Sequence, residues 1–522
     1  MRGNLTQLNG REFDVLVVGA GINGASAAQH LAAEGYSVLL VDKDDFGSGT
    51  TSRSSRLLHC GIRYFVPGSS LWEFVRHPDR AINALKMARM AMAMRAQMKR
   101  TTPQRLRSLN WCYPIYSDGQ YKPWQFDAAF RLLDALGPAD VPLGYHKLSG
   151  DGARATPLLK WQRRPEAMQG AAVVEEFQYH WPERIAVDTA LDAERLGATI
   201  RNHTPVVALA QSADGRWQAT LADTFAHGAQ ACVTAKAVVN TAGVWIDKVD
   251  ALAAAGAGRK VHGTKGVHIA FKIPAACGNY AVVNFSRDNQ PLFCAPFGDL
   301  HYIGPSEVNF SGDLDDVAPT NADIELMVEE ANLVLPGLGL KRSDVRFAWA
   351  GVRPLTYGGA AYPKGNRLRV LHDLDSDGMR NAVALTAGPI MTHRSAASEI
   401  VAAIRQKLAP SLAPQSLSYA ACAVPDNPAS PPLIPNQPAV RHSDLRHAAL
   451  HEHPQTLVDL LFRRVPVGWS DGMGYDVCRD AALVVADLMA WDNARIESEV
   501  EAYRAHVRHF HQLQITPVRE FA

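Results

Sequence analysis

The first residues with an evident chemical use are three glycines spaced as G-x-G-x-x-G, namely Gly19, Gly21 and Gly24. A short apolar run precedes them, a helical stretch follows, and a second apolar run ends at Asp42. This spacing lets the backbone approach a pyrophosphate, and the helix N-terminus presents free N–H groups to the phosphates. A carboxylate placed like Asp42 can accept a hydrogen bond from a ribose hydroxyl. The pattern therefore predicts a dinucleotide site.

The next loop, Gly47–Arg56, reads GSGTTSRSSR and is rich in hydroxyl groups. Hydroxyls and backbone N–H groups suit the diphosphate and ribityl chain of FAD, whereas a nicotinamide enzyme usually continues into further parallel βα units. A flexible polar loop is the alternative interpretation. We therefore expect FAD as the cofactor.

The run TTSRSSRLLHCGIRYF, residues 50–65, resembles the FAD-dependent glycerol-3-phosphate dehydrogenases. These enzymes are a quinone-reducing, membrane-linked branch of the D-amino-acid-oxidase-like flavoproteins. Further similar segments follow in the family's order, so the resemblance extends over about residues 12–510. They are VVNTAGVW (238–245), KGVHIAF (265–271), AGVRPL (350–355) and AALHEHPQTLVDLLFRRV (448–465).

The loop composition and the resemblance together imply which residues hold FAD. Small residues after a predicted strand, in the turn Thr241–Gly243, allow close approach of the backbone to the cofactor. The expected cofactor residues are Gly19, Gly21, Ile22, Asn23, Gly24, Asp42, Lys43, Thr50, Thr51, Ser52, Ser54, Ser55, Arg56, Leu57, Val206, Ala242, Gly243, Trp245, Gly388, Pro389, Ile390 and Met391.

Flavin chemistry also needs a group that takes the hydroxyl proton and cations that bind an anionic substrate. The resemblance places Arg63, Tyr64 and Arg353 at the substrate and its phosphate, and His59 and His268 near the flavin ring. We therefore predict His59, His268 and Arg353 as catalytic residues. His59 as an ordinary hydrogen-bonding residue of a packed turn, and Arg63 as an ordinary ion-pair residue, are the alternatives.

Strand geometry adds two arguments about these candidates. Arg353 lies in an extended segment, where an unpaired buried guanidinium is costly, so we expect an anion as its partner. Lys265 and His268 fall on opposite faces of a predicted strand, so we do not expect both to reach the substrate. His268 is the preferred candidate.

Two segments depart from the family pattern. The family's GGKLTTYR reads AGPIMTHR at 387–394, so Pro389 stands at the lysine position and His393 at the tyrosine position. Proline is tolerated in a first helical turn, so the helix start that faces the flavin stays while a cation near the substrate is lost. The family's GTTD reads GPSE at 304–307. Both changes fall where a substrate would be selected.

Composition limits the classes of protein. A chain of 522 residues exceeds one core and indicates two or three domains. A net charge of +1 gives no basis for nucleic-acid binding, and seven cysteines without metal spacing indicate reduced thiols and no metal site. We expect no signal peptide and no membrane-spanning helix. Residues 81–100 could form a membrane-surface helix, but their basic residues are spread widely, which favours a packed helix.

The predicted fold class is α/β, with a Rossmann-like FAD-binding domain, an inserted mixed or antiparallel β-sheet substrate domain and a C-terminal helical domain. An oxidoreductase region would span 12–410, with a Pro-rich linker at 411–442 and the helical domain at 443–522. The FAD-binding segments would be about 12–75, 171–261 and 360–408, and the substrate-domain segments about 76–170 and 262–359.

The predicted function is oxidation of a secondary alcohol of glycerol 3-phosphate or a related polyol phosphate. Hydride would pass to flavin N5 and the electrons to a quinone. We expect a cytoplasmic protein. Peripheral attachment to the inner face of the cell membrane and formation of a homodimer are both left open. The rival functions are a related flavoenzyme acting on a 2-hydroxy acid or an amine, and a flavin-binding regulatory protein without turnover.

Overall fold

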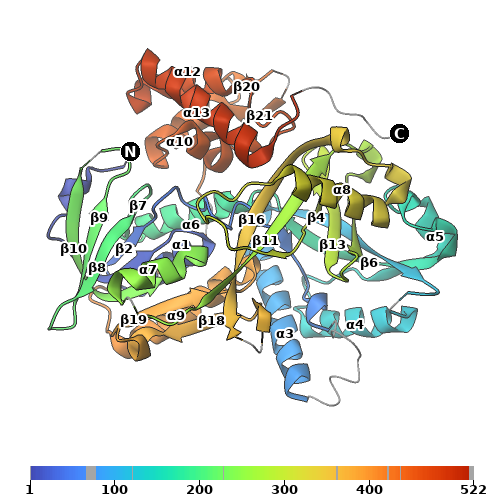
Figure 1. Cartoon of the computed structure of the whole chain (residues 1–522), viewed down its shortest axis with the longest axis horizontal. Coiled ribbons are helices and arrows are strands. Elements are labelled where there is room, and N and C mark those ends of the chain that lie inside the picture. The colour runs from blue at the N-terminus through green and yellow to red at the C-terminus, as the bar shows by residue number, and fades with distance from the viewer. Residues whose placement is uncertain are drawn as a thin grey trace.

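Two β-sheets and a group of C-terminal helices make up the chain (Figure 1). The structure is a computed structural model that describes residues 2–65, 78–119, 121–226, 228–254, 256–359, 362–419, 422–435 and 437–515.

The first sheet carries the glycine turn at the end of its central strand. Its strand order is β18-β19-β10-β1-β2-β7, with the β8–β9 hairpin attached to β10, and β19, β10, β1, β2 and β7 run parallel. The strands are β1 Glu12–Val18, β2 Val38–Val41, β7 Thr199–Arg201, β8 Val206–Gln211, β9 Trp217–Ala222, β10 Gln230–Asn240, β18 Val370–Asp373 and β19 Ala382–Thr386.

Both faces of this sheet are covered, which explains why Val15–Val18 in β1 and the whole of β2 are continuous apolar runs. Three helices pack on one face, and the β8–β9 hairpin and a fourth helix pack on the other. The three helices are α1 Ile22–Ala33, α6 Pro182–Arg195 and α9 His393–Lys407, and the fourth is α7 Ile246–Ala253.

The second sheet is mixed and mostly antiparallel, with strand order β17-β16-β11-β14-β13-β12-β4-β6-β3. Its one parallel pair among the described residues joins β12 to β4. The strands are β3 Leu57–Leu58, β4 Leu106–Tyr116, β5 His146–Ser149, β6 Met168–Tyr179, β11 Val261–Phe271, β12 Tyr280–Phe285, β13 Pro291–Phe297, β14 Leu300–Gly304, β15 Val308–Asn309, β16 Val345–Gly358 and β17 Tyr362–Asn366. Helices α5 Gly150–Ala155 and α8 Asn321–Val334 lie on one face.

The other face of the second sheet is covered by α4 (Pro123–Leu136), by α3 (Pro78–Thr101) and by the C-terminal helices. Helix α3 buries Ala88, Met92 and Arg95, so it is packed along one side, as the spread of its basic residues predicts. Its N-terminal half exposes Ile82 and Leu85. Within the described residues, no helix combines the length and apolar character needed to cross a bilayer.

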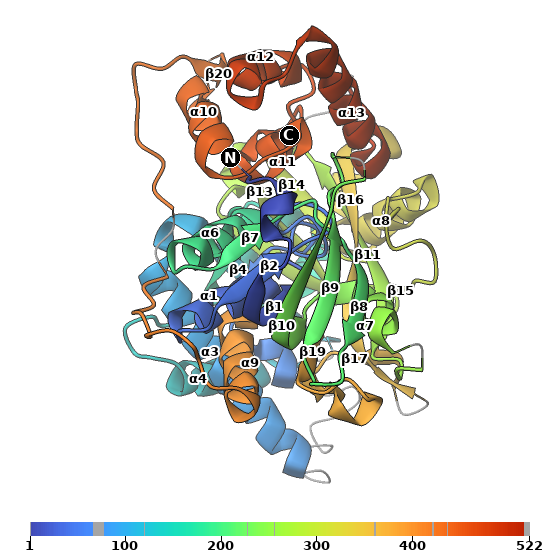
Figure 2. The ribbon, with the colours of Figure 1, turned by 90° about the vertical axis from the view of Figure 1, so that its left-hand side faces the viewer.

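The segment predicted as a linker runs along the outside of the molecule from α9 to the C-terminal helices (Figure 2). It ends in a small antiparallel pair, β20 (Pro432–Ile434) and β21 (Gln437–Arg441), that the sequence did not predict. The helices are α10 His442–His451, α11 Leu457–Asp459, α12 Cys478–Met489 and α13 Asn493–His511, with a π-helical turn at Leu460–Arg464. The predicted fold class is confirmed, whereas the domain boundaries stay a prediction.

Candidate active site

A cavity of about 1560 Å³ lies where the glycine turn of the first sheet meets β11 and β16 of the second. This is larger than the 300–1000 Å³ or so of a site for one small ligand. All but three of the predicted cofactor residues line it. The exceptions are Gly24, Ser52 and Met391, which lie behind its wall.

The glycine turn has the shape that a bound pyrophosphate requires. Gly19 has φ +95°, and a Cβ there would lie 2.7 Å from the carbonyl oxygen of Thr241. A Cβ on Gly24 would lie 1.8 Å from the carbonyl oxygen of Gly19, so only glycine allows helix α1 to pack this closely. A Cβ on Gly21 would meet nothing closer than Thr51 Oγ1 at 3.4 Å, which leaves its backbone open to the cavity. The turn fits a dinucleotide.

Asp42 closes the second strand and lines the cavity. Its Oδ2 accepts the N–H of Ala20 at 2.6 Å, and its Oδ1 accepts the N–H of Asp44 at 2.9 Å. Burial and the neighbouring charge of Asp44 raise the pKa of Asp42 to about 7. A ribose hydroxyl that donated to this carboxylate would stabilise its ionised form.

Lys43 and Trp245 lie together at the same wall. The Lys43 ammonium lies 4.2 Å from the centroid of the Trp245 ring and forms an ion pair with Asp315. Trp245 Nε1 donates to the same carboxylate at 2.8 Å. These contacts fix a cation and an aromatic face at the edge of the cavity.

The hydroxyl-rich loop uses much of its hydrogen-bonding capacity within the protein. Thr50 Oγ1 donates to the carbonyl of Val352 at 2.7 Å, and Thr51 Oγ1 accepts the N–H of Ile22 at 3.1 Å. These bonds tie the loop to β16 and to the start of α1. The hydroxyls therefore shape the cavity wall as well as line it.

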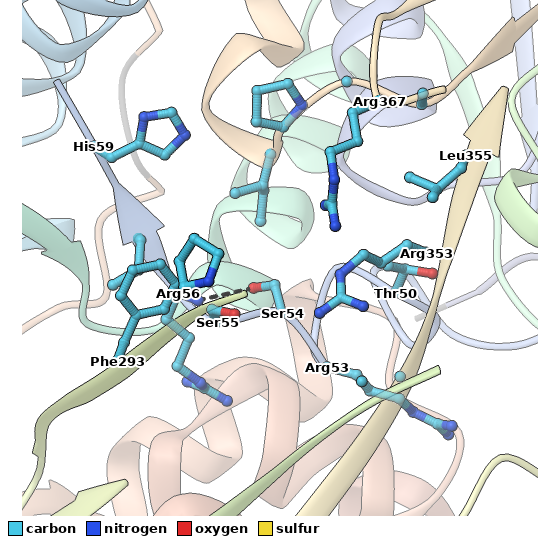
Figure 3. Close-up of a pocket in the computed structure, with 18 of the residues that line it drawn as sticks. Thr50, Arg53, Ser54, Ser55, Arg56, His59, Phe293, Arg353, Leu355 and Arg367 are labelled. Carbon is cyan, nitrogen blue, oxygen red and sulfur yellow. Dashed lines mark hydrogen bonds between the residues drawn. The ribbon is translucent and has the colours of Figure 1, made fainter. Parts of the chain in front are cut away.

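Arg56 contributes its backbone to the wall, but its side chain points away from the pocket (Figure 3). The guanidinium lies 4.7 Å from the Phe297 ring and 4.2 Å from the Trp469 ring, with Glu183 at 3.4 Å. Its side chain thus packs against the C-terminal region, so any contact of Arg56 with a cofactor would involve its backbone.

Arg353 extends from β16 into the cavity. Its Nη2 lies 3.4 Å from the carbonyl oxygen of Ser306, and no protein acceptor among the described residues bonds to its Nη1. A Cβ on Gly266 would lie 2.5 Å from Nη2, so a glycine at this position of β11 makes room for the guanidinium. Burial and the charge of Arg367 lower the pKa of Arg353 to about 10.

Arg367, which the sequence interpretation did not select, extends toward the same part of the cavity (Figure 3). It follows β17 and forms an ion pair with Glu307, the last residue of the divergent GPSE segment. The start of α9 also lines the cavity through Gly388, Pro389 and Ile390. Arg367 thus adds a second cation, beside Arg353, to the lining of this cavity.

His268 is buried on β11 and lines the cavity. Its Nε2 lies 3.0 Å from Ser55 Oγ, and its ring stacks on Trp349 with centroids 4.7 Å apart. Burial, followed by the charges of Arg353 and Arg56, holds the pKa of His268 well below its ordinary value, so the ring is neutral. Lys265 faces the other side of the strand and donates to Asp323 at 2.7 Å, as strand parity predicts.

His59 is half-buried and lines the cavity on the side opposite Arg353 and Arg367 (Figure 3). Its Nδ1 accepts the N–H of Gly61 at 3.1 Å, which places the proton of the neutral ring on Nε2. Arg63 and Tyr64 follow in the short 3-10 turn Ile62–Phe65, and their side chains lie outside the described part of the structure.

Comparisons with known proteins identify the family of the chain. Residues 14–402 match the family described as FAD dependent oxidoreductase. A glycerol-3-phosphate dehydrogenase of Synechocystis sp. is 30% identical over 79% of this chain and 73% of its own length. A D-erythritol 1-phosphate dehydrogenase of Brucella abortus is 30% identical over 74% of this chain and 72% of its own.

The fold is similar to that of a solved structure, a glycerol-3-phosphate dehydrogenase from Bacillus halodurans complexed with FAD. The TM-score is 0.70 at 17% identity, covering 99% of this chain and 98% of the other. The predicted cofactor, FAD, is confirmed by the family match and suits the glycine turn and Asp42. The chain belongs to the FAD-dependent oxidoreductase family, in the branch of the glycerol-3-phosphate dehydrogenases that its motifs resemble.

Proposed function

We propose that this chain oxidises a secondary alcohol of glycerol 3-phosphate or a closely related polyol phosphate to the ketone. The observation that supports this most is Arg353, a half-buried side chain whose Nη1 is shielded from solvent and has no hydrogen-bond partner among the described residues. A buried cation without a partner is costly unless a ligand supplies the anion. Arg367 lies beside it, and two guanidinium groups suit a phosphate dianion better than a single carboxylate.

When bound, FAD supplies the acceptor for the hydride of the substrate's secondary C–H bond. The two arginines hold the phosphate at one end of the cavity and so place the substrate's carbon chain along it. The reaction also requires a group that takes the hydroxyl proton as the ketone forms.

His268 is our candidate for this proton acceptor, acting with Ser55. Ser55 Oγ can donate to His268 Nε2 and accept from the substrate hydroxyl, since both residues line the cavity. The positive charge of Arg353 opposes protonation of His268 in the absence of an anion. A bound phosphate would offset that charge, so proton transfer would be favoured once the substrate is in place. His59 is the less suitable acceptor, because its Nδ1 lone pair already accepts the N–H of Gly61.

The test is anaerobic mixing of the purified holoenzyme with possible donors while the visible absorbance of the flavin is followed. The panel contains glycerol 3-phosphate, tetritol phosphates, 2-hydroxy acids and N-methyl amino acids. We expect bleaching by phosphorylated alcohols alone. Bleaching by hydroxy acids or amino acids, with none by any phosphorylated alcohol, refutes the substrate class. A spectrum that no donor changes favours the regulatory alternative.

We also propose that a membrane quinone reoxidises the enzyme at the inner face of the cell membrane. The support is the family resemblance together with Ile82 and Leu85, which are 52% and 37% exposed on α3 beside Lys86 and Arg89. Such a surface suits an anionic bilayer. The double variant Ile82→Ser, Leu85→Ser should reduce co-sedimentation with anionic liposomes, and Leu483→Ser on α12 is the control. Equal sedimentation of both variants argues against this surface. Gel filtration tests whether the protein forms the homodimer that the sequence leaves open.

A further inference from the structure

The cavity continues past His59 and Phe293 into a side region lined by aromatic residues. We call it the aromatic arm and define it by Trp111, Tyr113, Tyr121, Phe126, Phe285 and Phe293. The Phe293 ring contacts Trp111 at 5.8 Å between centroids. Phe126 contacts Tyr113 and Tyr121 at 6.1 Å each, and Tyr121 contacts Phe285 at 6.3 Å. These residues come from β4, α4, β12 and β13 and from the loop between β4 and α4, and all six line the cavity.

Its position follows from the site already described. Arg353 and Arg367 lie on one side of the pocket, and His59 and Phe293 lie on the other (Figure 3). A substrate whose phosphate is held by the arginines would therefore point its far end toward Phe293. Any carbon atoms beyond those of glycerol 3-phosphate would extend toward the arm.

The arm contains polar atoms without a hydrogen-bond partner in the described part of the chain. Trp111 is 1% exposed, and its Nε1 has no hydrogen-bond partner among the described residues. The hydroxyl of Tyr121 is likewise buried without a described partner. Unsatisfied buried donors are uncommon and costly, which indicates that a ligand supplies their acceptors.

An acceptor lines the cavity as well. Glu176, on β6, is 2% exposed, and its Oε1 accepts the N–H of Cys60 at 3.2 Å. Strands β3 and β6 are antiparallel, with Leu58 opposite Phe177. Glu176, the residue before Phe177, is therefore placed beside His59, the residue after Leu58. A hydroxyl group both donates and accepts hydrogen bonds, so a wall with N–H and O–H donors and a carboxyl acceptor suits it.

We propose that the aromatic arm binds the additional hydroxyl groups of a polyol phosphate longer than glycerol 3-phosphate. Trp111 and Tyr121 donate to these hydroxyls, Glu176 accepts from them, and the ring faces pack on the carbon chain. The preferred substrate is then a phosphorylated polyol of four or five carbons. This inference rests on the proposed function and assigns the substrate within its class.

The experiment compares glycerol 3-phosphate with tetritol and pentitol phosphates of each configuration, in the wild-type holoenzyme and in Tyr121→Phe. At least one longer substrate should have a kcat/KM about tenfold above that of glycerol 3-phosphate. Tyr121→Phe should lower kcat/KM for that substrate about three- to tenfold, mainly through KM, and leave glycerol 3-phosphate unchanged. Trp111→Phe, which removes only the ring N–H, should act in the same direction.

Tyr145→Phe is the matched control, because the Tyr145 hydroxyl donates to Asp127 at 2.6 Å and does not line the cavity. It should leave the ratio of the two substrates unchanged. Calorimetric titration with the corresponding ketose phosphates, which have no secondary alcohol at the oxidised carbon, gives a readout independent of turnover. The longer ketose phosphate should lose affinity in Tyr121→Phe, whereas dihydroxyacetone phosphate should not.

The outcomes separate this inference from the proposed function. If glycerol 3-phosphate is the best substrate and Tyr121→Phe does not alter the ratio, the inference is wrong while the proposed function stands. If Tyr121→Phe changes KM for the electron acceptor alone, the arm binds the acceptor and the inference is also wrong. If no phosphorylated polyol of any length bleaches the flavin, the proposed function itself fails.

Discussion

Arginines that line the cavity and arginines buried against the C-terminal helices differ in how their donors are hydrogen-bonded. In the cavity, Arg353 makes one long contact of 3.4 Å. At the C-terminal interface, Arg464 donates to both oxygens of Asp45 at 2.7 Å and to the carbonyl of Glu452 at 2.8 Å. Arg184 likewise binds both oxygens of Glu452.

The difference separates structural charges from functional ones. Buried charges are tolerated when they are paired and hydrogen-bonded, and Arg464 and Arg184 meet this condition within the protein. In the cavity, Nη1 of Arg353 has no hydrogen-bond partner among the described residues, so a bound ligand must supply one. A buried arginine therefore indicates a binding site only where its donors lack protein partners.

The same pairing of charges argues against a bound metal ion at a cluster of possible ligands in this interface. Ligand atoms of Asp45, His203 and Asp459 lie within 4.8 Å of one another. Each carboxylate already accepts from arginine, since Arg463 binds both Asp45 and Asp459. Their negative charge is already offset by the two arginines, Arg463 and Arg464.

The largest effect should come from breaking the paired region. Asp45→Asn keeps the size of the side chain but leaves Arg464 without its counter-charge, so we expect a loss of about 3–5 kcal/mol in the free energy of unfolding. Urea denaturation of the holoenzyme measures this loss. Asp140→Asn, which removes one partner of an exposed ion pair, is the control and should leave the urea midpoint unchanged. Equal midpoints for all three proteins would contradict the structural role.

The pH dependence of this loss has a definite sign. Burial alone would raise the pKa of Asp45, but the charges of Arg464 and Arg463 and the hydrogen bond from Arg464 together outweigh burial and lower the pKa below the ordinary 3.8. A lowered carboxyl pKa contributes stability above about pH 4, which is lost as the pH falls through the folded-state pKa. The difference between wild type and Asp45→Asn should therefore shrink below about pH 4.

The cavity arginine should respond in the opposite way. Arg353→Met should lower kcat/KM for a phosphorylated polyol by about 30- to 1000-fold, because it removes about 2–4 kcal/mol of charged hydrogen bonding to the substrate. Its urea midpoint should be equal to that of the wild type or higher, because the variant no longer buries an unpaired cation. Normal turnover together with impaired folding would reverse our assignment of the two regions.

Local features of the site could be predicted from the sequence, and long-range ones could not. The glycine turn was predictable because its three glycines lie within six residues and Gly24 approaches Gly19 directly, although the crowding at Gly19 comes from distant Thr241. Arg367 was not, because its partner Glu307 lies 60 residues away and the intervening strands decide that they meet. Arg56 belongs to a loop that suits a cofactor, yet its guanidinium packs against Trp469 far along the chain.

A smaller effect on substrate binding is expected at Arg367, the second arginine of the cavity. Arg367 is 40% exposed and is neutralised by Glu307, so it is intermediate between the two groups. Glu307→Gln removes the competing charge and should lower KM for glycerol 3-phosphate by up to about fivefold, which corresponds to the 1 kcal/mol or so of a partly exposed ion pair. Glu34→Gln, which frees an exposed arginine elsewhere, is the control. A raised KM in Glu307→Gln would show that Glu307 positions Arg367 rather than competing with the substrate.

The smallest expected effect concerns Asp42, an acid at the cavity wall whose pKa is raised to about 7 by burial and by Asp44. Because a ribose hydroxyl donates best to the ionised form, the Kd for FAD should rise by a few-fold as the pH falls below about 7.

The stability of the apoprotein should depend on pH in the opposite direction, being greater at low pH. Because folding raises the pKa of the Asp42 carboxyl, its full stabilising contribution is present below about pH 4 and is lost as the pH rises through 7. Asp42→Asn should flatten both profiles, which titration of the apoprotein with FAD and urea denaturation at several pH values can measure. A Kd profile unchanged in Asp42→Asn would assign the pH dependence to another group and leave Asp42 without a role in holding the cofactor.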